Sequence, residues 1–176
     1  EVMSLTIVLL NYLPQKLALP FPVIVIGVVL FSGAVGAVSG FIVVKLKVNS
    51  LIATLGMSEV LSALQLYLSQ NHQVSYTFSS SFVKAGNGDL FGVPYLDLYL
   101  LVIAAGLWFV LEQTPVGRRM FAVGGNRDAA RLAGISTDRV VWGSLIASGV
   151  IASLAGVMYT AQVGAFSSLQ VGALGT

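Results

Sequence analysis

Long apolar runs separated by short polar segments make up most of the chain. A membrane-spanning helix needs about 17–25 mostly apolar residues, and four runs reach this length. We therefore predict spanning helices over residues 20–44, 51–70, 93–111 and 139–163. The fold class that follows is all-α, a polytopic helical membrane protein.

The chain begins in an apolar run, residues 2–13, that is too short to span a bilayer. We expect this run to be the end of a helix that starts earlier. A turn that contains Asn11, Pro14, Gln15 and Lys16 should follow it. We interpret residues 1–176 as one transmembrane domain that is incomplete at both ends.

Small residues recur at every fourth position in two of the predicted spans. The first span contains Ser32, Gly36 and Gly40 at this spacing, and the last contains such a series from Ser144 to Thr160. Small side chains spaced in this way let a neighbouring helix approach closely in lipid. We therefore predict helix packing at five of them: Gly36, Gly40, Ser148, Ala152 and Gly156.

Composition supports a membrane protein and narrows the chemistry. The chain is 56% hydrophobic and 9% charged, whereas soluble domains carry about 25% charged residues. Its formal net charge is +2, with the cations in short connections, which does not favour binding to nucleic acid. The chain has no cysteine and one histidine, so we predict no metal site and no cofactor.

The distribution of basic residues predicts an orientation. Cytoplasmic connections of membrane proteins carry an excess of Lys and Arg. If the connection 112–138 is cytoplasmic, seven of the nine basic residues lie on that side: Lys45, Lys47, Arg118, Arg119, Arg127, Arg131 and Arg139. Only Lys16 and Lys84 then lie outside, and the opposite orientation would reverse this ratio.

One acidic residue, Glu59, lies near the middle of a predicted span. An acid at membrane depth is costly, so its side chain should face a cavity or a polar partner. One interpretation is a residue that lines or gates a transport pathway. The alternative is a structural hydrogen bond between helices, or a helix shallow enough for Glu59 to meet water.

The connection 112–138 contains the pattern of a short helix over residues 126–135. Asn126 is a good N-cap, and Asp128 suits the first turn, where the helix dipole favours an anion. Gly134 can adopt the left-handed conformation that ends a helix, with Ile135 folding back over Ala130. So short a helix is not stable alone. It must lie against this chain's own membrane domain or against a partner.

The sequence offers little for catalysis. It contains no Walker A pattern for binding ATP. Its seven acidic residues are scattered along the chain, and no pair of them has the helical spacing needed for acid–base work. We therefore predict that the chain is not an enzyme.

Two stretches carry a resemblance to the ribose-type permease subunits of bacterial ABC importers for simple sugars. The family pattern G-R-x-x-x-A-x-G-G-N-x-x-A-A-x-x-x-G-I is matched by GRRMFAVGGNRDAARLAGI, residues 117–135. A second family stretch is similar to GAVGAVSGFIVVKLKVNSLIATLG, residues 33–56. Here the chain departs from the family at Ser39, where an Asn is usual, and beyond this stretch at Glu59, where the family is generally apolar. The resemblance covers roughly residues 33–164.

The resemblance implies a permease of the bacterial cytoplasmic (inner) membrane. Its partners would be a cytoplasmic ABC ATPase, a second permease subunit (identical or paralogous), an external sugar-binding protein and the lipid bilayer. The short helix would be the coupling element that sits in a groove of the ATPase. The residues assigned to coupling are Gly125, Asn126, Arg127, Ala129, Ala130, Arg131, Leu132, Gly134 and Ile135.

Two alternatives remain open from the sequence. The first is a branched-chain amino-acid ABC permease, which has a similar fold and connection, although the AVGGN run favours the sugar branch. The second is a secondary transporter or membrane scaffold that works without an ATPase. The basic residues also have a second interpretation, because ordinary positive-inside bias alone would place them there.

Overall fold

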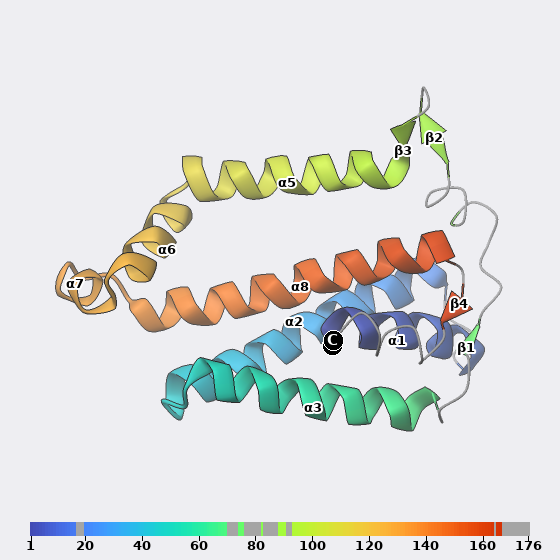
Figure 1. Cartoon of the computed structure of the whole chain (residues 1–176), viewed down its shortest axis with the longest axis horizontal. Coiled ribbons are helices and arrows are strands. Elements are labelled where there is room, and N and C mark those ends of the chain that lie inside the picture. Colours follow the sequence, from blue (N-terminus) through green and yellow to red (C-terminus); the bar gives the residue numbers. More distant parts are fainter. Residues whose placement is uncertain are drawn as a thin grey trace.

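The computed structural model describes residues 1–16, 20–69, 74–75, 82, 88–90, 93–163 and 165–166. The helices of these ranges are α1 (Val2–Lys16), α2 (Phe21–Lys45), α3 (Ser50–Ser69), α5 (Tyr95–Gln113), α6 (Pro115–Gly125), α7 (Arg127–Leu132) and α8 (Thr137–Val163) (Figure 1). Four two-residue strands form two antiparallel pairs: β1 (Val74–Ser75) with β4 (Ala165–Phe166), and β2 (Asp89–Leu90) with β3 (Val93–Pro94). Because each of these strands has only two residues and the helices make up most of the described chain, the all-α fold class is confirmed.

Four helices of the described chain, α2, α3, α5 and α8, are long and apolar enough to cross a membrane. They occupy the segments in which spans were predicted, and the helix ends lie within two residues of the expected ones. Local signals fix several of these ends. Pro20 and Pro22 flank the first residue of α2. A backbone N–H in this first turn has no partner within the helix, so a proline here loses no helical hydrogen bond. Asn49 accepts a hydrogen bond from the backbone N–H of Leu51 at 2.9 Å at the start of α3.

Helices α1, α2, α3 and α8 form a bundle, with the most extensive packing between α2 and α8 (Figure 1). Its buried core lies around α1, where Leu5, Ile7, Val8 and Leu10 are almost fully inaccessible. Helix α5 lies apart from this bundle, and none of its residues is buried. It connects to the bundle through α6 and α7 at one end of the molecule, so its apolar surface remains open within the described chain.

Close helix crossings depend on glycine. A Cβ on Gly36 of α2 would lie 2.5 Å from the carbonyl oxygen of Leu145 in α8. A Cβ on Gly149 of α8 would lie 2.6 Å from the carbonyl oxygen of Ser32 in α2. One turn along α2, the Cβ position of Gly40 is filled by the ring of Trp142, whose indole N–H donates to the carbonyl oxygen of Ala37 at 2.8 Å. The two backbones therefore meet directly at this crossing.

The other small residues of α8 have different surroundings. Gly156 packs against α1, because a Cβ there would lie 2.9 Å from both the Met3 carbonyl oxygen and the Thr6 side chain. Ser148 is exposed and Ala152 is half-buried. Gly149, which the four-residue spacing passes over, makes the close approach to α2 instead.

The expected turn at the end of the first apolar run is wrong. Helix α1 continues through Pro14 to Lys16. Pro14 lies in the last turn, where its missing N–H removes a single helical bond. Asn11 is fully buried within the helix, and its side-chain amide donates to the carbonyl oxygen of Ile7 at 2.9 Å. A polar residue that bonds to its own helix therefore does not mark a turn here.

Helix α6 lies inside the connection 112–138, where no helix was predicted before residue 126. Thr114 is its N-cap and Pro115 its first residue, the combination that favours a helix start. Gly117 allows the sharp turn between α5 and α6, because a Cβ there would overlap the backbone of Leu111. The connection is thus three consecutive short elements, α6, α7 and the start of α8, rather than an open loop.

Candidate functional site

The start of α7 has the cap that the sequence predicts. Asn126 has an extended backbone, and its side-chain oxygen accepts a hydrogen bond from the N–H of Ala129 at 2.9 Å. This bond satisfies one of the N–H groups that a helix start leaves without a partner. Asp128 lies in the first turn, where its charge favours the helix dipole. The predicted helix start is confirmed.

The end of α7 also follows the prediction. The backbone N–H of Ile135 donates to the carbonyl oxygen of Ala130, and that of Gly134 donates to the carbonyl oxygen of Arg131, both at 3.0 Å. Gly134 has φ of +79°, in the left-handed region that glycine adopts at low cost. These two bonds and this conformation form a Schellman motif. Residues 133–136 then lead directly into α8.

The two sides of α7 differ in exposure. Ala130 is only 5% exposed and Ile135 is half-buried, so they anchor the segment to its own chain. Leu132 is 90% exposed, and Ala129 three residues earlier is exposed as well. Residues three apart lie on one face of a helix. An apolar patch, Ala129 with Leu132, therefore lies uncovered outside the predicted spans.

Three charged residues of α7, Arg127, Asp128 and Arg131, are exposed beside this patch, as are Gly125 and Asn126. Arg127 Nη2 lies 3.2 Å from Asp138 Oδ1, an ion pair that ties the start of α7 to the first turn of α8. Because both side chains are more than half exposed, the pair stabilises this contact by no more than about 1 kcal/mol. The ion pair therefore helps to orient α7 but contributes little to its stability.

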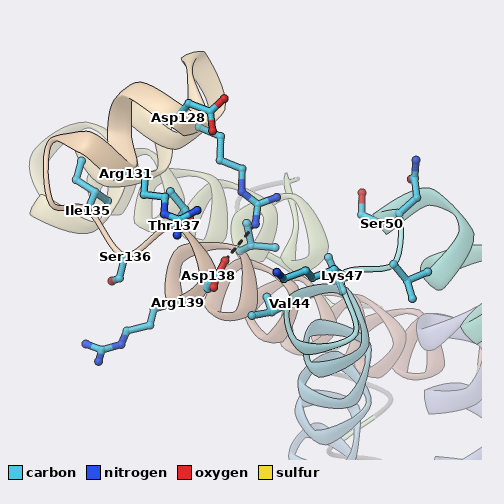
Figure 2. Close-up of a pocket in the computed structure, with 15 residues that line it drawn as sticks. Val44, Lys47, Ser50, Asp128, Arg131, Ile135, Ser136, Thr137, Asp138 and Arg139 are labelled. Carbon is cyan, nitrogen blue, oxygen red and sulfur yellow. Dashed lines mark hydrogen bonds and ion pairs between the residues drawn. The ribbon is translucent and has the colours of Figure 1, made fainter.

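A cavity of about 970 Å³ lies beside α7. Figure 2 shows it between two parts of the chain. One is the α2–α3 connection with the first residue of α3, where Lys47 and Ser50 lie, and the other is the α7–α8 segment, where Arg131 and Thr137 lie. Four cations and two carboxylates line it: Lys47, Arg127, Arg131 and Arg139, with Asp128 and Asp138. The cavity is therefore a basic hollow at the end of the bundle where α2 stops and α8 begins.

Glu59 lies elsewhere, near the middle of α3. The buried residues of α3 are Ala53, Leu61, Gln65 and Ser69, whereas Glu59 is exposed together with Gly56, Val60 and Ala63. The carboxylate is therefore not directed into the bundle of α1, α2, α3 and α8. Glu59 does not line the cavity beside α7 that Arg127, Arg131 and Ile135 share.

Comparison with known proteins places this arrangement in a family. Residues 2–174 match the model of a family described as branched-chain amino acid transport system / permease component. The D-allose transport system permease protein AlsC of Escherichia coli is 36% identical over 150 residues, covering 85% of this chain and 46% of that protein. No solved structure matches the chain.

Two further relatives have similar coverage. The ribose import permease protein RbsC of Haemophilus influenzae is 30% identical over 151 residues, covering 84% of this chain and 47% of that protein. The L-arabinose ABC transporter permease protein AraH of Azospirillum brasilense is 34% identical over 137 residues, covering 78% and 40%. The chain thus spans about half the length of the curated relatives it matches. With four helices suited to crossing a membrane and a family match over nearly its whole length, it is a multi-pass membrane protein that belongs to the branched-chain amino acid transport system permease family.

Proposed function

We propose that the chain forms part of the permease subunit of an ABC importer for a simple sugar, in the bacterial cytoplasmic membrane. All three relatives described above are named as permeases for sugars: allose, ribose and arabinose. The permease works with a separate cytoplasmic ATPase, a second permease subunit and an external sugar-binding protein. It supplies the membrane pathway and no ATP chemistry of its own.

Helix α7 is the element that couples the permease to the ATPase. The observation that carries this role is Leu132, an apolar side chain 90% exposed on a helix whose two ends are already capped. A six-residue helix with an uncovered apolar patch is preorganised for a partner groove, so docking costs little ordering entropy. Ala129 lets the partner surface come close, and Arg127 and Arg131 suit acidic groups at the rim of that groove.

The remaining coupling residues shape α7 or connect it to the bundle. Gly125 ends α6, Asn126 caps the start of α7, and Gly134 and Ile135 end α7. Ala130 is buried and anchors it. Only residues 133–136 separate α7 from α8, and α8 crosses α2 with backbone contact at Gly36 and Gly149. A displacement of α7 by the ATPase is therefore passed to the α2–α8 pair as a rigid unit.

Glu59 faces the second permease subunit or the transport pathway. An ionised carboxylate facing lipid is costly, and Glu59 is exposed on α3 in the single chain. Another protein surface or water must therefore meet it in the assembled transporter. Gly56 and Ala63 on the same exposed face are small, which favours close approach of a neighbouring helix.

The α6–α7 end of the molecule faces the cytoplasm. Lys45, Lys47 and the five arginines lie at the end formed by the α2–α3 connection, α6, α7 and the start of α8 (Figure 1). Lys16 lies at the end of α1, and Lys84 lies outside the described residues. This asymmetry is the one that positive-inside bias produces.

Cysteine labelling tests the orientation. This chain has no cysteine, so single cysteines can be placed at Arg119 of α6 and at Ser80, which lies outside the described residues. In a full-length protein freed of any other cysteine, an impermeant thiol reagent on intact cells should label Ser80→Cys and spare Arg119→Cys. Both should react after the cells are permeabilised, which controls for access. The reverse pattern on intact cells would contradict the proposed topology.

Reconstituted uptake tests the function. The full-length permease should be combined in proteoliposomes with its ATPase and binding protein, and supplied in turn with labelled allose, ribose, arabinose and leucine. We expect ATP-dependent uptake of at least one sugar and none of leucine. Uptake of leucine alone would favour the amino-acid alternative. Uptake driven by an ion gradient without the ATPase would favour a secondary transporter.

A further inference from the structure

A second, smaller cavity lies at the junction of α2 and α8. It has a volume of about 320 Å³ and is lined by Phe41, Val44, Lys45, Asp138, Arg139 and Trp142. The first three belong to the last turns of α2, and the other three to the first turns of α8. We propose that this cavity binds the headgroup of an anionic phospholipid from the cytoplasmic leaflet.

The charges of the cavity favour an anion. Lys45 and Arg139 are exposed, and in the described part of the chain neither side chain takes part in a hydrogen bond or ion pair. Asp138 also lines the cavity, but its carboxylate is already paired with Arg127 at 3.2 Å. The cavity is therefore lined by two cations that have no partner in the described chain, and by one carboxylate whose charge Arg127 already balances. The positive end of the α8 dipole adds to this field.

From the ends of α2 and α8 toward the middle of the membrane, the cations come first and the aromatic residues follow. This order matches a lipid and not a free anion. Phe41 lies one turn before Lys45, and Trp142 lies three residues after Arg139, which sets the Cα of each aromatic residue about 4.5–6 Å deeper along its helix than the Cα of the cation. Phe41 and Trp142 are 53% and 43% exposed, on the outer surface of two apolar helices. Cations at the depth of the lipid phosphate, with aromatic side chains closer to the middle of the membrane, fit a phosphate group with its attached acyl chains. Basic pockets between spanning helices bind such headgroups.

The site is held rigidly by the helix crossing. The Trp142 ring fills the Cβ position of Gly40, and its N–H is fixed to the Ala37 carbonyl oxygen. The indole is therefore not free to rotate into the cavity and close it. Arg139 lines both this cavity and the basic hollow beside α7. Figure 2 shows its side chain extending away from Asp138 and Lys47, so its guanidinium is available to the lipid. The proposal rests on membrane insertion of α2 and α8 and on the proposed cytoplasmic orientation of this end, and not on the cargo of the transporter.

Native mass spectrometry of the full-length permease tests this site. The protein, purified in detergent, is mixed with equal amounts of phosphatidylglycerol and phosphatidylcholine. An interfacial Lys or Arg contributes about fivefold to affinity for anionic lipid. We expect preferential retention of phosphatidylglycerol by the native protein. The preference should fall by about fivefold in Lys45→Gln and in Arg139→Gln, and by roughly 25- to 30-fold in the double variant.

Matched variants separate this site from general surface charge. Arg118→Gln with Arg119→Gln removes the same charge from exposed positions on α6 and should leave the lipid preference unchanged. We expect each variant to fold, because the replaced side chains make no hydrogen bond or ion pair with other described residues. Monodispersity in gel filtration checks this. An unchanged preference in the Lys45/Arg139 double variant would overturn the proposal, and so would an equal loss in the α6 control.

Two further outcomes identify a different ligand. If inorganic phosphate or glycerol phosphate displaces phosphatidylglycerol, the site recognises a free anion and the lipid assignment is wrong. If the double variant keeps its lipid preference but no longer co-purifies with the ATPase, the two cations belong to a protein interface instead. Displacement by neither anion and normal ATPase association, with loss of the lipid preference, supports the proposal.

Discussion

Replacing Leu132 with Glu should detach the ATPase and abolish transport while leaving the permease in the membrane at normal abundance. Leu132 is 90% exposed, so the substitution removes no contact within the chain. In the docked complex it would place a charge in a desolvated apolar contact. Changes at the centre of an interface commonly cost 2 kcal/mol or more, which is roughly a 30-fold loss of affinity. Ala129→Glu, on the same face, should act in the same direction.

Co-purification of the ATPase with each full-length variant, alongside uptake, measures this effect. Leu132→Met keeps an apolar side chain of similar size and should retain both activities. Ala130→Glu is the buried counterpart, because Ala130 is only 5% exposed. It should lower the abundance of the permease itself. If Leu132→Glu and Ala129→Glu leave ATPase binding and uptake intact, α7 is not the coupling element and the secondary-transporter alternative gains support.

The helix stop offers a milder variant within the same experiment. Gly134→Val should weaken ATPase binding less than Leu132→Glu does. Nothing lies within 4 Å of a Cβ at Gly134, so its effect comes from the left-handed backbone alone, which costs an L-residue roughly 1–2 kcal/mol. Gly134→Asn is the matched control, because Asn tolerates this conformation. A loss with Val that Asn does not share would attribute the effect to the stop itself.

Adding a single methyl group at Gly36 should destabilise the permease. The new Cβ would lie 2.5 Å from the Leu145 carbonyl oxygen and 2.9 Å from the Ile146 Cα. Both are backbone atoms of α8, so no side chain can move aside, and α2 must shift away. Overpacking of this kind typically costs about 1–3 kcal/mol. Thermal unfolding of the purified protein should therefore occur at a lower temperature in Gly36→Ala, and Gly36→Leu should reduce abundance in the membrane.

Gly27→Ala is the matched control on the same helix, because nothing lies within 4 Å of a Cβ there. It should be neutral or slightly stabilising, since Ala has the higher helix propensity. Gly149→Ala tests the crossing from the other helix, with its Cβ 2.6 Å from the Ser32 carbonyl oxygen. The two crossing variants share one contact, so their combined effect should differ from the sum. Equal stability of Gly27→Ala and Gly36→Ala would show that α2 and α8 do not meet closely here.

Helix ends could be read from the sequence where the signal is local. The span bounds follow from apolar runs bordered by charge, proline or a capping residue. The two ends of α7 follow from Asn126 and Gly134, whose roles depend on bonds to residues three to five positions away. The same kind of signal, Thr114 followed by Pro115, marks α6 and could have revealed it. The three glycines and two arginines that follow are typical of a loop, and they obscure this signal.

Which face of a helix meets a neighbour could not be read from spacing alone. An α-helix turns about 100° per residue, so residues four apart drift by about 40° at each step. The short series Ser32, Gly36 and Gly40 stays on one side of α2 and meets α8. The longer series on α8 winds around the helix, so Gly156 contacts α1 while Ser148 is exposed. Gly149 is the residue that meets α2.

The sequence by itself determined the class of protein, the four apolar helices and the start and stop of α7, because burial in lipid and helix capping depend on residues close together in the chain. Only the tertiary structure decided that Leu132 is exposed while Ala130 is buried, and that Glu59 points away from the bundle. It also brought Lys45 and Arg139, far apart in sequence, to one cavity. These features depend on which helix lies opposite, and a pattern along one helix does not contain that information.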